Sequence, residues 1–286
     1  MTDAPPHPAR LAQPPWKAAL RPLAAAVSAP ALRSPLLTVR PAPVNPAFNP
    51  DPARLADLAR RFHAEPRPLD RPLIILAGWR SPPSVANAVA ARLIALTSHD
   101  HLDALPISYT FRGDIPSIAR LACARIRRAL GVASGEPAQS LRPIDVVGIS
   151  MGGLVARTIE AGLAGEHPRI ARLFTIGTPH RGARLASRIA PDRASSQMRA
   201  DSEFLRNLEE RESHDAMELH CYANLNDRMV GATNTAPHGR NPMWIPGTRL
   251  LSHFAATQDR RILLDIASRL RGEQPIAAPD EPPPTD

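Results

Sequence analysis

The chain has 286 residues, of which 43% are hydrophobic, enough for one large domain with tails or two small domains. Its formal net charge is +8, and Lys17 is the only lysine, so the positive charge comes from arginine. No basic run is dense enough for a nucleic-acid-binding arm, and no apolar run is long enough to cross a membrane. We expect no nucleic-acid partner and no transmembrane segment, although an arginine-rich surface is compatible with peripheral membrane contact.

Proline, with 33 residues, is concentrated toward the two ends of the chain. Proline-rich segments cannot sustain helices or central strands, so residues 1–50 are expected to be a disordered tail. The acidic, proline-rich residues 272–286 are expected to form a second one, which leaves 51–271 as the folded domain. The apolar stretch 23–27 is too short for a signal peptide and follows a proline-rich lead, which favours a cytoplasmic location.

Apolar runs and helical spacing alternate along the domain. A continuous apolar run, typical of a strand covered on both faces, occurs at 73–77, and further strands are predicted at 106–110, 144–147, 172–176, 217–223 and 243–245. Helical spacing occurs at 53–62, 85–96, 115–130, 154–159, 202–210 and 259–270. This alternation predicts an α/β fold whose mostly parallel sheet is flanked by helices. The polar region 183–216 departs from the alternation and is expected to be a short cap or lid with one helix.

The sequence Gly148-Ile149-Ser150-Met151-Gly152 lies between a predicted strand and a predicted helix. A serine at such a turn is exposed at the end of a sheet, where it can act as a nucleophile, and the two glycines let strand and helix approach closely. The pattern fixes only three positions and would arise by chance in roughly one chain in ten of this length. Its context makes Ser150 the candidate nucleophile rather than an inert turn serine.

A serine hydroxyl needs a base, usually histidine, and a carboxylate that orients the histidine. Asp227 follows the strand 217–223 and leaves the sheet at the same edge as Ser150. His253 lies in a loop before the last helix, which completes the order Ser, Asp, His found in many such sheets. The hypothesis is a triad of Ser150, Asp227 and His253.

Other acids and histidines are weaker candidates. Asp215 precedes a strand and would lie at the wrong edge, and Asp201 and Glu203 belong to the irregular region. His180 also follows a strand but precedes Asp227, which breaks the order. His238, unlike His253, does not lie in the loop directly before the last helix.

The oxyanion of a tetrahedral intermediate needs two donors. The backbone N–H of Met151 directly follows the nucleophile, and that of Trp79 lies in the loop after the first core strand. The Trp79 side chain is also interpreted as a hydrophobic lid residue.

Four segments together resemble the α/β-hydrolase superfamily: 148–153, 177–182 (Gly-Thr-Pro-His-Arg-Gly), 227–230 and 252–254. The segment 177–182 is similar to the corresponding element of lipases and related lipid esterases. The resemblance, over about residues 70–271, implies the α/β-hydrolase fold and hydrolysis of a small-molecule or lipid ester through an acyl-enzyme on Ser150. It also implies a structural role for His180. Lipases often carry His-Gly before the oxyanion residue, whereas this chain has Ala77-Gly78, which weakens the substrate assignment.

Several alternatives remain open. A thioesterase, an amidase or an acyltransferase would use the same three side chains, and a binding protein of the same fold would use none of them. A proline-rich adaptor would act through residues 1–50. The sequence predicts no cofactor and no metal site. Cys123 and Cys221 are interpreted as buried thiols rather than as a disulfide.

Overall fold

A computed structural model describes residues 43–109, 113–131, 142–165, 167–211, 217–247, 252–279 and 281–284. Within these ranges six parallel strands form one sheet in the order β2-β1-β3-β4-β5-β6. The strands are β1 (Leu73–Leu76), β2 (Ala104–Ile107), β3 (Ile144–Ile149), β4 (Ile170–Ile176), β5 (Glu218–Asn224) and β6 (Met243–Ile245). The predicted α/β class with a parallel central sheet is confirmed.

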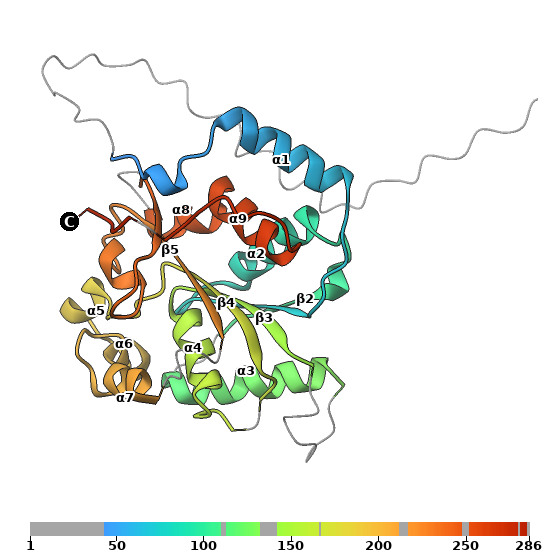
Figure 1. The fold of residues 1–286 in the computed structure, drawn as a ribbon. Helices are drawn as coiled ribbons and strands as arrows, with labels where there is room; N and C mark the ends of the chain where they lie inside the picture. The colour runs from blue at the N-terminus through green and yellow to red at the C-terminus, as the bar shows by residue number, and fades with distance from the viewer. Residues whose placement is uncertain are drawn as a thin grey trace, which may run out of the picture. The chain divides into compact units, whose positions relative to one another are not determined.

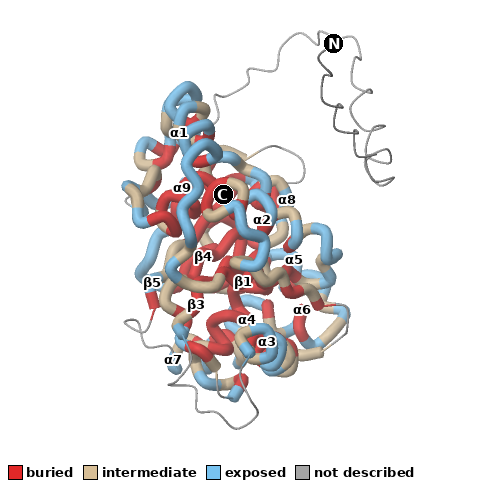
Figure 2. Tube along the Cα trace, turned by 90° about the vertical axis from the view of Figure 1, so that its right-hand side faces the viewer, coloured by how far each residue is buried: buried red, intermediate tan, exposed pale blue. Residues whose placement is uncertain are grey.

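Helices cover both faces of the sheet. The longer ones are α1 (Pro52–Ala64), α2 (Pro83–Leu96), α3 (Ile115–Ala129), α4 (Met151–Glu160) and α9 (Arg260–Leu270). Figure 1 shows α1, α2 and α9 on one side of the sheet and α3 and α4 on the other. In Figure 2 the tube is red along β1, β3 and β4, between these layers. Burial on both faces explains why β1, all four of whose residues are buried, reads as a continuous apolar run.

The region 183–216 contains more helix than predicted. The structure places three helices in its described part, α5 (Arg184–Arg188), α6 (Arg193–Gln197) and α7 (Glu203–Arg211), where the sequence predicted one; residues 212–216 lie outside the described residues. The first two helices have five residues each, too few for a 3.6-residue periodicity to be visible.

The packed region extends past the predicted boundaries at 51 and 271. Phe48 is fully buried, and Asn45 donates from Nδ2 to the carbonyl of Trp244 at 2.8 Å. The Trp244 indole in turn donates to the carbonyl of Glu281 at 3.0 Å, and Ala277 is buried. Segments on both sides of the predicted domain therefore pack against its strands, because they supply apolar and hydrogen-bonding groups that their proline content obscured. Residues 1–42 lie outside the described residues.

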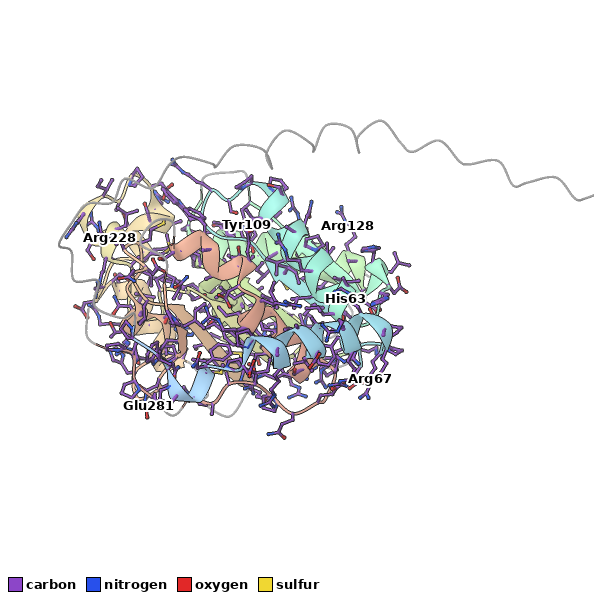
Figure 3. All side chains as sticks on the ribbon, turned by 90° about the horizontal axis from the view of Figure 1, so that it is seen from above. His63, Arg67, Tyr109, Arg128, Arg228 and Glu281 are labelled. Atoms are coloured by element: carbon purple, nitrogen blue, oxygen red, sulfur yellow. The ribbon has the colours of Figure 1, made fainter. Side chains whose placement is uncertain are left out.

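Positive charge is spread over the described surface. Figure 3 shows Arg67, Arg128 and Arg228 at well separated places on the molecule. Some arginines are also partnered, as Arg172 is with the buried carboxylate of Asp145 at 2.5 Å. In the described ranges no helix has the length and apolar character needed to span a bilayer.

The start of α4 packs against the sheet without room for side chains. A Cβ atom on Gly152 would lie 2.1 Å from the carbonyl oxygen of Leu76 in β1, and one on Gly148 would lie 2.5 Å from Cα of Gly153. Real carbon atoms do not approach so closely, so only glycine allows the strand to turn into the helix at this distance.

We expect Gly152→Ala to lower the free energy of unfolding by about 3 kcal/mol, because the added methyl group must push α4 away from β1. Urea unfolding of the purified variant measures the loss. Gly162→Ala is the control, since this glycine (φ +73°) has no atom within 4 Å of a built Cβ, so only backbone strain of about 1 kcal/mol applies. Equal losses in the two variants would contradict the close-contact explanation.

Candidate functional site

Ser150 lies between β3 and α4 in a strained backbone conformation, with φ 52° and ψ −122°. Such a conformation is rare for a residue with a side chain and persists only where the surroundings fix it. Two hydrogen bonds do so here. The Ser150 N–H donates to the carbonyl of Ile176 at 2.8 Å, and Thr178 Oγ1 donates to the carbonyl of Ser150 at 2.8 Å.

Asp227 and His253 meet in a buried hydrogen bond. Nδ1 of His253 lies 2.7 Å from Oδ2 of Asp227, and both side chains are almost completely buried. The other carboxylate oxygen, Oδ1, accepts the backbone N–H groups of Met229 at 2.9 Å and Val230 at 3.1 Å. Because an ionised carboxylate only accepts, the imidazole carries its proton on Nδ1, which makes Nε2 the basic nitrogen.

His253 lies on a short helix, α8 (Ser252–Ala255), and not in the loop that the sequence predicted. Asn224, the last residue of β5, holds this helix by donating from Nδ2 to the carbonyl of Ser252 at 2.8 Å. Gly177 packs closely against the pair: a Cβ there would lie 3.3 Å from the His253 ring and 3.6 Å from Asp227. The imidazole is therefore held from two strand ends.

Ser150 and His253 line the same cavity, of about 430 Å³. Most of its remaining lining is apolar and comes from the cap-like segment, from β3, from α2 and α8, and from the loops after the strands: Val85, Ile149, Pro179, Ala183, Leu185, Ala186, Ile189, Pro191, Met198, Met229, Val230 and Phe254. Three of these residues are also large exposed hydrophobics, namely Leu185, Ile189 and Phe254. An apolar cavity with a few polar groups at one end is the common form of a small-molecule site.

The predicted oxyanion donors are close to Ser150 in the chain or the fold: Met151 follows it directly, and Trp79 follows Gly78. A Cβ built on Gly78 would lie 3.3 Å from Cβ of Ser150, so this loop passes beside the serine. Within the described part of the chain, no protein group accepts a hydrogen bond from the backbone N–H of Trp79 or of Met151. For Met151 this follows from its place as the first residue of α4, where the helix has no acceptor to offer.

The other acids and histidines lie in different surroundings. His238 is exposed and pairs with Glu209 at 2.7 Å. Asp201 and Glu203 are exposed at the start of α7, and Asp215 lies outside the described residues.

His180 is buried in a network of its own. An Arg157 guanidinium nitrogen donates to Nδ1 of His180 at 3.1 Å, so the ring proton is on Nε2, 3.1 Å from Oγ1 of Thr175. Burial, together with the charge of Arg157, holds the pKa of His180 well below its usual range. The buried thiol of Cys221 lies 3.7 Å from Nε2, and Cys123 is also a buried thiol. These contacts support a structural role for His180.

Three residues near the site were missed by the sequence analysis. Thr178 and Asn224 hold the backbone beside Ser150 and His253, and Asp192 contacts Trp79. Only Asp192 carried a sequence signal. It stands three residues before Ser195, a spacing typical of a helix N-terminus, and the two form a capping box.

No protein-family model and no curated protein matches the sequence. Solved structures do match the fold. The lipase BlEst2 of Bacillus licheniformis in its propeptide form is 14% identical, with 77% of this chain aligned to 54% of that chain at a TM-score of 0.50. The phospholipase PlaB of Legionella pneumophila is 13% identical over 58% of this chain and 45% of its own, at 0.47. The lin2722 product of Listeria innocua is 12% identical over 71% and 95%, at 0.47.

The chain therefore has the α/β-hydrolase fold that its motifs resemble. It spans about half the length of the BlEst2 propeptide form. A likeness at this level of identity concerns the fold alone, so the activity has to be argued from the site.

We expect His180→Gln to remove part of the acid sensitivity of folding. Below about pH 6.5 a histidine in the unfolded chain binds a proton, whereas the buried His180 of the folded protein does not. The unfolded state therefore binds more protons, and the free energy of unfolding decreases as the pH is lowered. One such group contributes at most about 1.4 kcal/mol per pH unit. Thermal unfolding of both proteins between about pH 8 and pH 5 measures the difference. Parallel stability curves for the variant and the wild type would contradict the buried neutral state of His180.

Proposed function

We propose that this protein is a serine hydrolase that cleaves carboxylic esters with an apolar acyl group, through an acyl-enzyme on Ser150. The observation that carries the proposal is the buried Asp227–His253 hydrogen bond of 2.7 Å, whose imidazole lines the same cavity as Ser150. A buried, oriented carboxylate–histidine pair beside a strained serine is the arrangement that nucleophilic catalysis by serine needs.

In the proposed reaction, Nε2 of His253 takes the proton of Ser150 as Oγ attacks the ester carbonyl carbon. Asp227 stabilises the resulting imidazolium and keeps the ring in the required tautomer. The carbonyl oxygen becomes an oxyanion that accepts the backbone N–H groups of Trp79 and Met151. The imidazolium then gives its proton to the leaving alcohol. A water molecule, deprotonated by His253, releases the acid and restores Ser150.

The substrate class is inferred from the cavity. Its apolar lining suits an acyl chain rather than a charged or sugar-like group. Three hydrophobic side chains at the cavity, Leu185, Ile189 and Phe254, are exposed to water. An apolar ligand that covered them would remove this apolar surface from water, which is favourable in free energy. Ester, thioester and acyl-transfer chemistry would share the same three side chains, so substrate tests must separate them.

We expect Ser150→Ala to reduce hydrolysis of p-nitrophenyl esters by about 10⁶-fold, or to background. A fluorophosphonate probe should label the wild type at Ser150 and leave the variant unlabelled, because the probe needs an activated hydroxyl. Wild-type turnover by Ser150→Ala would sink the proposal. An unlabelled wild type without activity on esters or thioesters would instead favour a binding protein of this fold.

Ile189→Ser should impair long acyl chains selectively. Losing the apolar contact of this side chain is worth roughly 1 kcal/mol, which corresponds to about a fivefold higher KM for palmitate esters with little change for acetate esters. Leu102→Ser is the matched control, because Leu102 is 93% exposed, more than any other large hydrophobic residue that the structure describes, and does not line the cavity. The same KM change for acetate and palmitate, or the same change in the control, would contradict the assignment of the acyl site.

A further inference from the structure

The loop that carries Trp79 is strained and has no regular structure of its own. It connects β1 to α2, and Arg80 within it has a positive φ of 50°. Backbone in this region is costly for a residue with a side chain and requires support from its surroundings. Gly78 fixes one end of the loop against Ser150. The support for the Trp79–Arg80 end must come from elsewhere.

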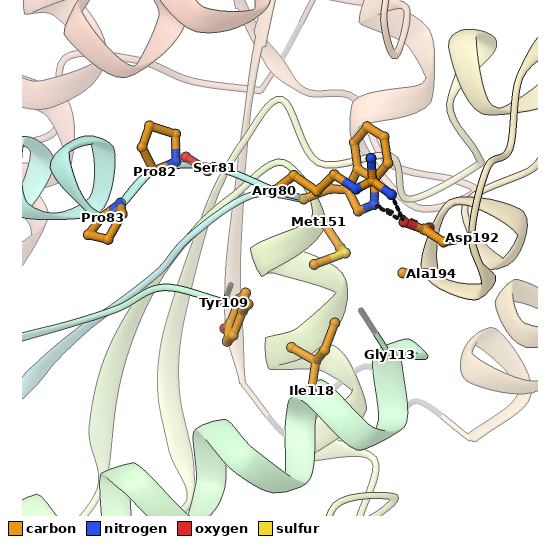
Figure 4. Close-up of a pocket in the computed structure, with 11 residues that line it drawn as sticks. Arg80, Ser81, Pro82, Pro83, Tyr109, Gly113, Ile118, Met151, Asp192 and Ala194 are labelled. Carbon is orange, nitrogen blue, oxygen red and sulfur yellow. Dashed lines mark hydrogen bonds and ion pairs between the residues drawn. The ribbon is translucent and has the colours of Figure 1, made fainter. Parts of the chain in front are cut away.

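Asp192 supplies that support from the cap-like segment. The Trp79 indole Nε1 donates to its carboxylate, 3.0 Å from Oδ2 and 3.2 Å from Oδ1. A guanidinium nitrogen of Arg80 donates to the same Oδ2 at 2.9 Å, and the guanidinium lies over the Trp79 ring at 4.6 Å. Figure 4 shows these bonds converging on Asp192. We call this group, Trp79, Arg80 and Asp192, the clasp.

The carboxylate in the clasp is itself held. Asp192 caps α6: its Oδ1 accepts the backbone N–H of Ser195 at 2.9 Å and the Ser195 hydroxyl at 2.8 Å. Burial by itself would raise the pKa of Asp192, but the hydrogen bonds from Ser195 and Trp79 and the charge of Arg80 outweigh burial and lower that pKa. The anion therefore has partners on both sides, and only 11% of its side chain is exposed.

Packing holds the loop only in part: Trp79 is half-buried against the hydrophobic core, and the loop also borders open space on two sides. Residues 79–82 line the catalytic cavity and also a second cavity of about 370 Å³, whose other lining residues include Tyr109 and Met151. In Figure 4 the Met151 side chain lies between the Arg80–Asp192 pair and Ile118. Beside these cavities the half-buried Trp79 side chain has fewer close contacts than a fully buried one, so its directional hydrogen bonds add to the restraint that packing gives.

We propose that Asp192 is a positioning residue for the oxyanion hole: by holding the indole of Trp79 it fixes the direction of the Trp79 backbone N–H beside Ser150. The proposal rests on the proposed function, in which that N–H stabilises the transition state. An ordinary surface ion pair between Arg80 and Asp192 would contribute little, because Arg80 is largely exposed. The half-buried indole bond carries the effect.

The test removes the indole bond while keeping the backbone N–H. Trp79→Phe does so with an aromatic ring still in place, and we expect kcat on p-nitrophenyl esters to fall about 10- to 100-fold with KM unchanged, because a misdirected donor acts on the transition state. Trp244→Phe is the matched control. It deletes an indole hydrogen bond of the same 3.0 Å length, to Glu281, and should lower the thermal midpoint without changing kcat.

Asp192→Asn completes a double-mutant cycle. An asparagine still caps a helix well, so α6 should stay folded while the charged acceptor is lost. If Trp79 and Asp192 act through one bond, the double variant should lose no more kcat than the worse single variant. If the fold-losses in kcat of the two single variants multiply in the double variant, or if Trp79→Phe has a normal kcat, the proposal is wrong. Loss of fluorophosphonate labelling in Ser150→Ala alongside normal kcat in Trp79→Phe would refute the clasp and leave the proposed function standing.

Discussion

The close approach of α4 to the sheet is the constraint on which the site depends. Gly152 brings the first turn of the helix against the carbonyl oxygen of Leu76, and Gly148 lets the chain leave β3 beneath it. Two hydrogen bonds, to the carbonyl of Ile176 and from Thr178, then hold Ser150 at φ 52°. The first N–H of α4, that of Met151, has no acceptor within the helix because of its position there. The close turn therefore places the serine and the first N–H of α4 side by side.

The parallel sheet does the rest of the assembly. Because all its strands run in one direction, their carboxyl ends share an edge, and each end contributes one part of the site. β1 leads to Gly78 and Trp79, β3 to Ser150, β4 to Gly177 and Thr178, and β5 to Asn224 and Asp227. Each part is then fixed by a hydrogen bond from a neighbouring strand end, as Thr178 does for the Ser150 carbonyl. The strands therefore fix the positions of these residues at one edge of the sheet.

The cap-like segment relates to the strand ends in two ways. Its apolar residues, including Leu185 and Ile189 on and beside α5, form much of the cavity that Ser150 and His253 line. Its one carboxylate in the clasp, Asp192, reaches back to the loop after β1. The segment therefore contacts both the cavity that Ser150 and His253 line and the loop that carries Trp79.

The sequence by itself determined the order of the strands and longer helices and the turn around Ser150. The continuous apolar run at β1 predicted a strand covered on both faces, and the glycines on either side of Ser150 predicted a close turn. Tertiary structure alone decided the rest. In the folded protein His253 lies on the short helix α8 and not in a loop, and Phe48 is buried although it precedes the predicted domain boundary. Asp192 and Trp79, which are far apart in the sequence, form a hydrogen bond. The physical reason is that period and composition are local properties, whereas these contacts join residues far apart in the chain, whose energy depends on which surfaces the fold brings together.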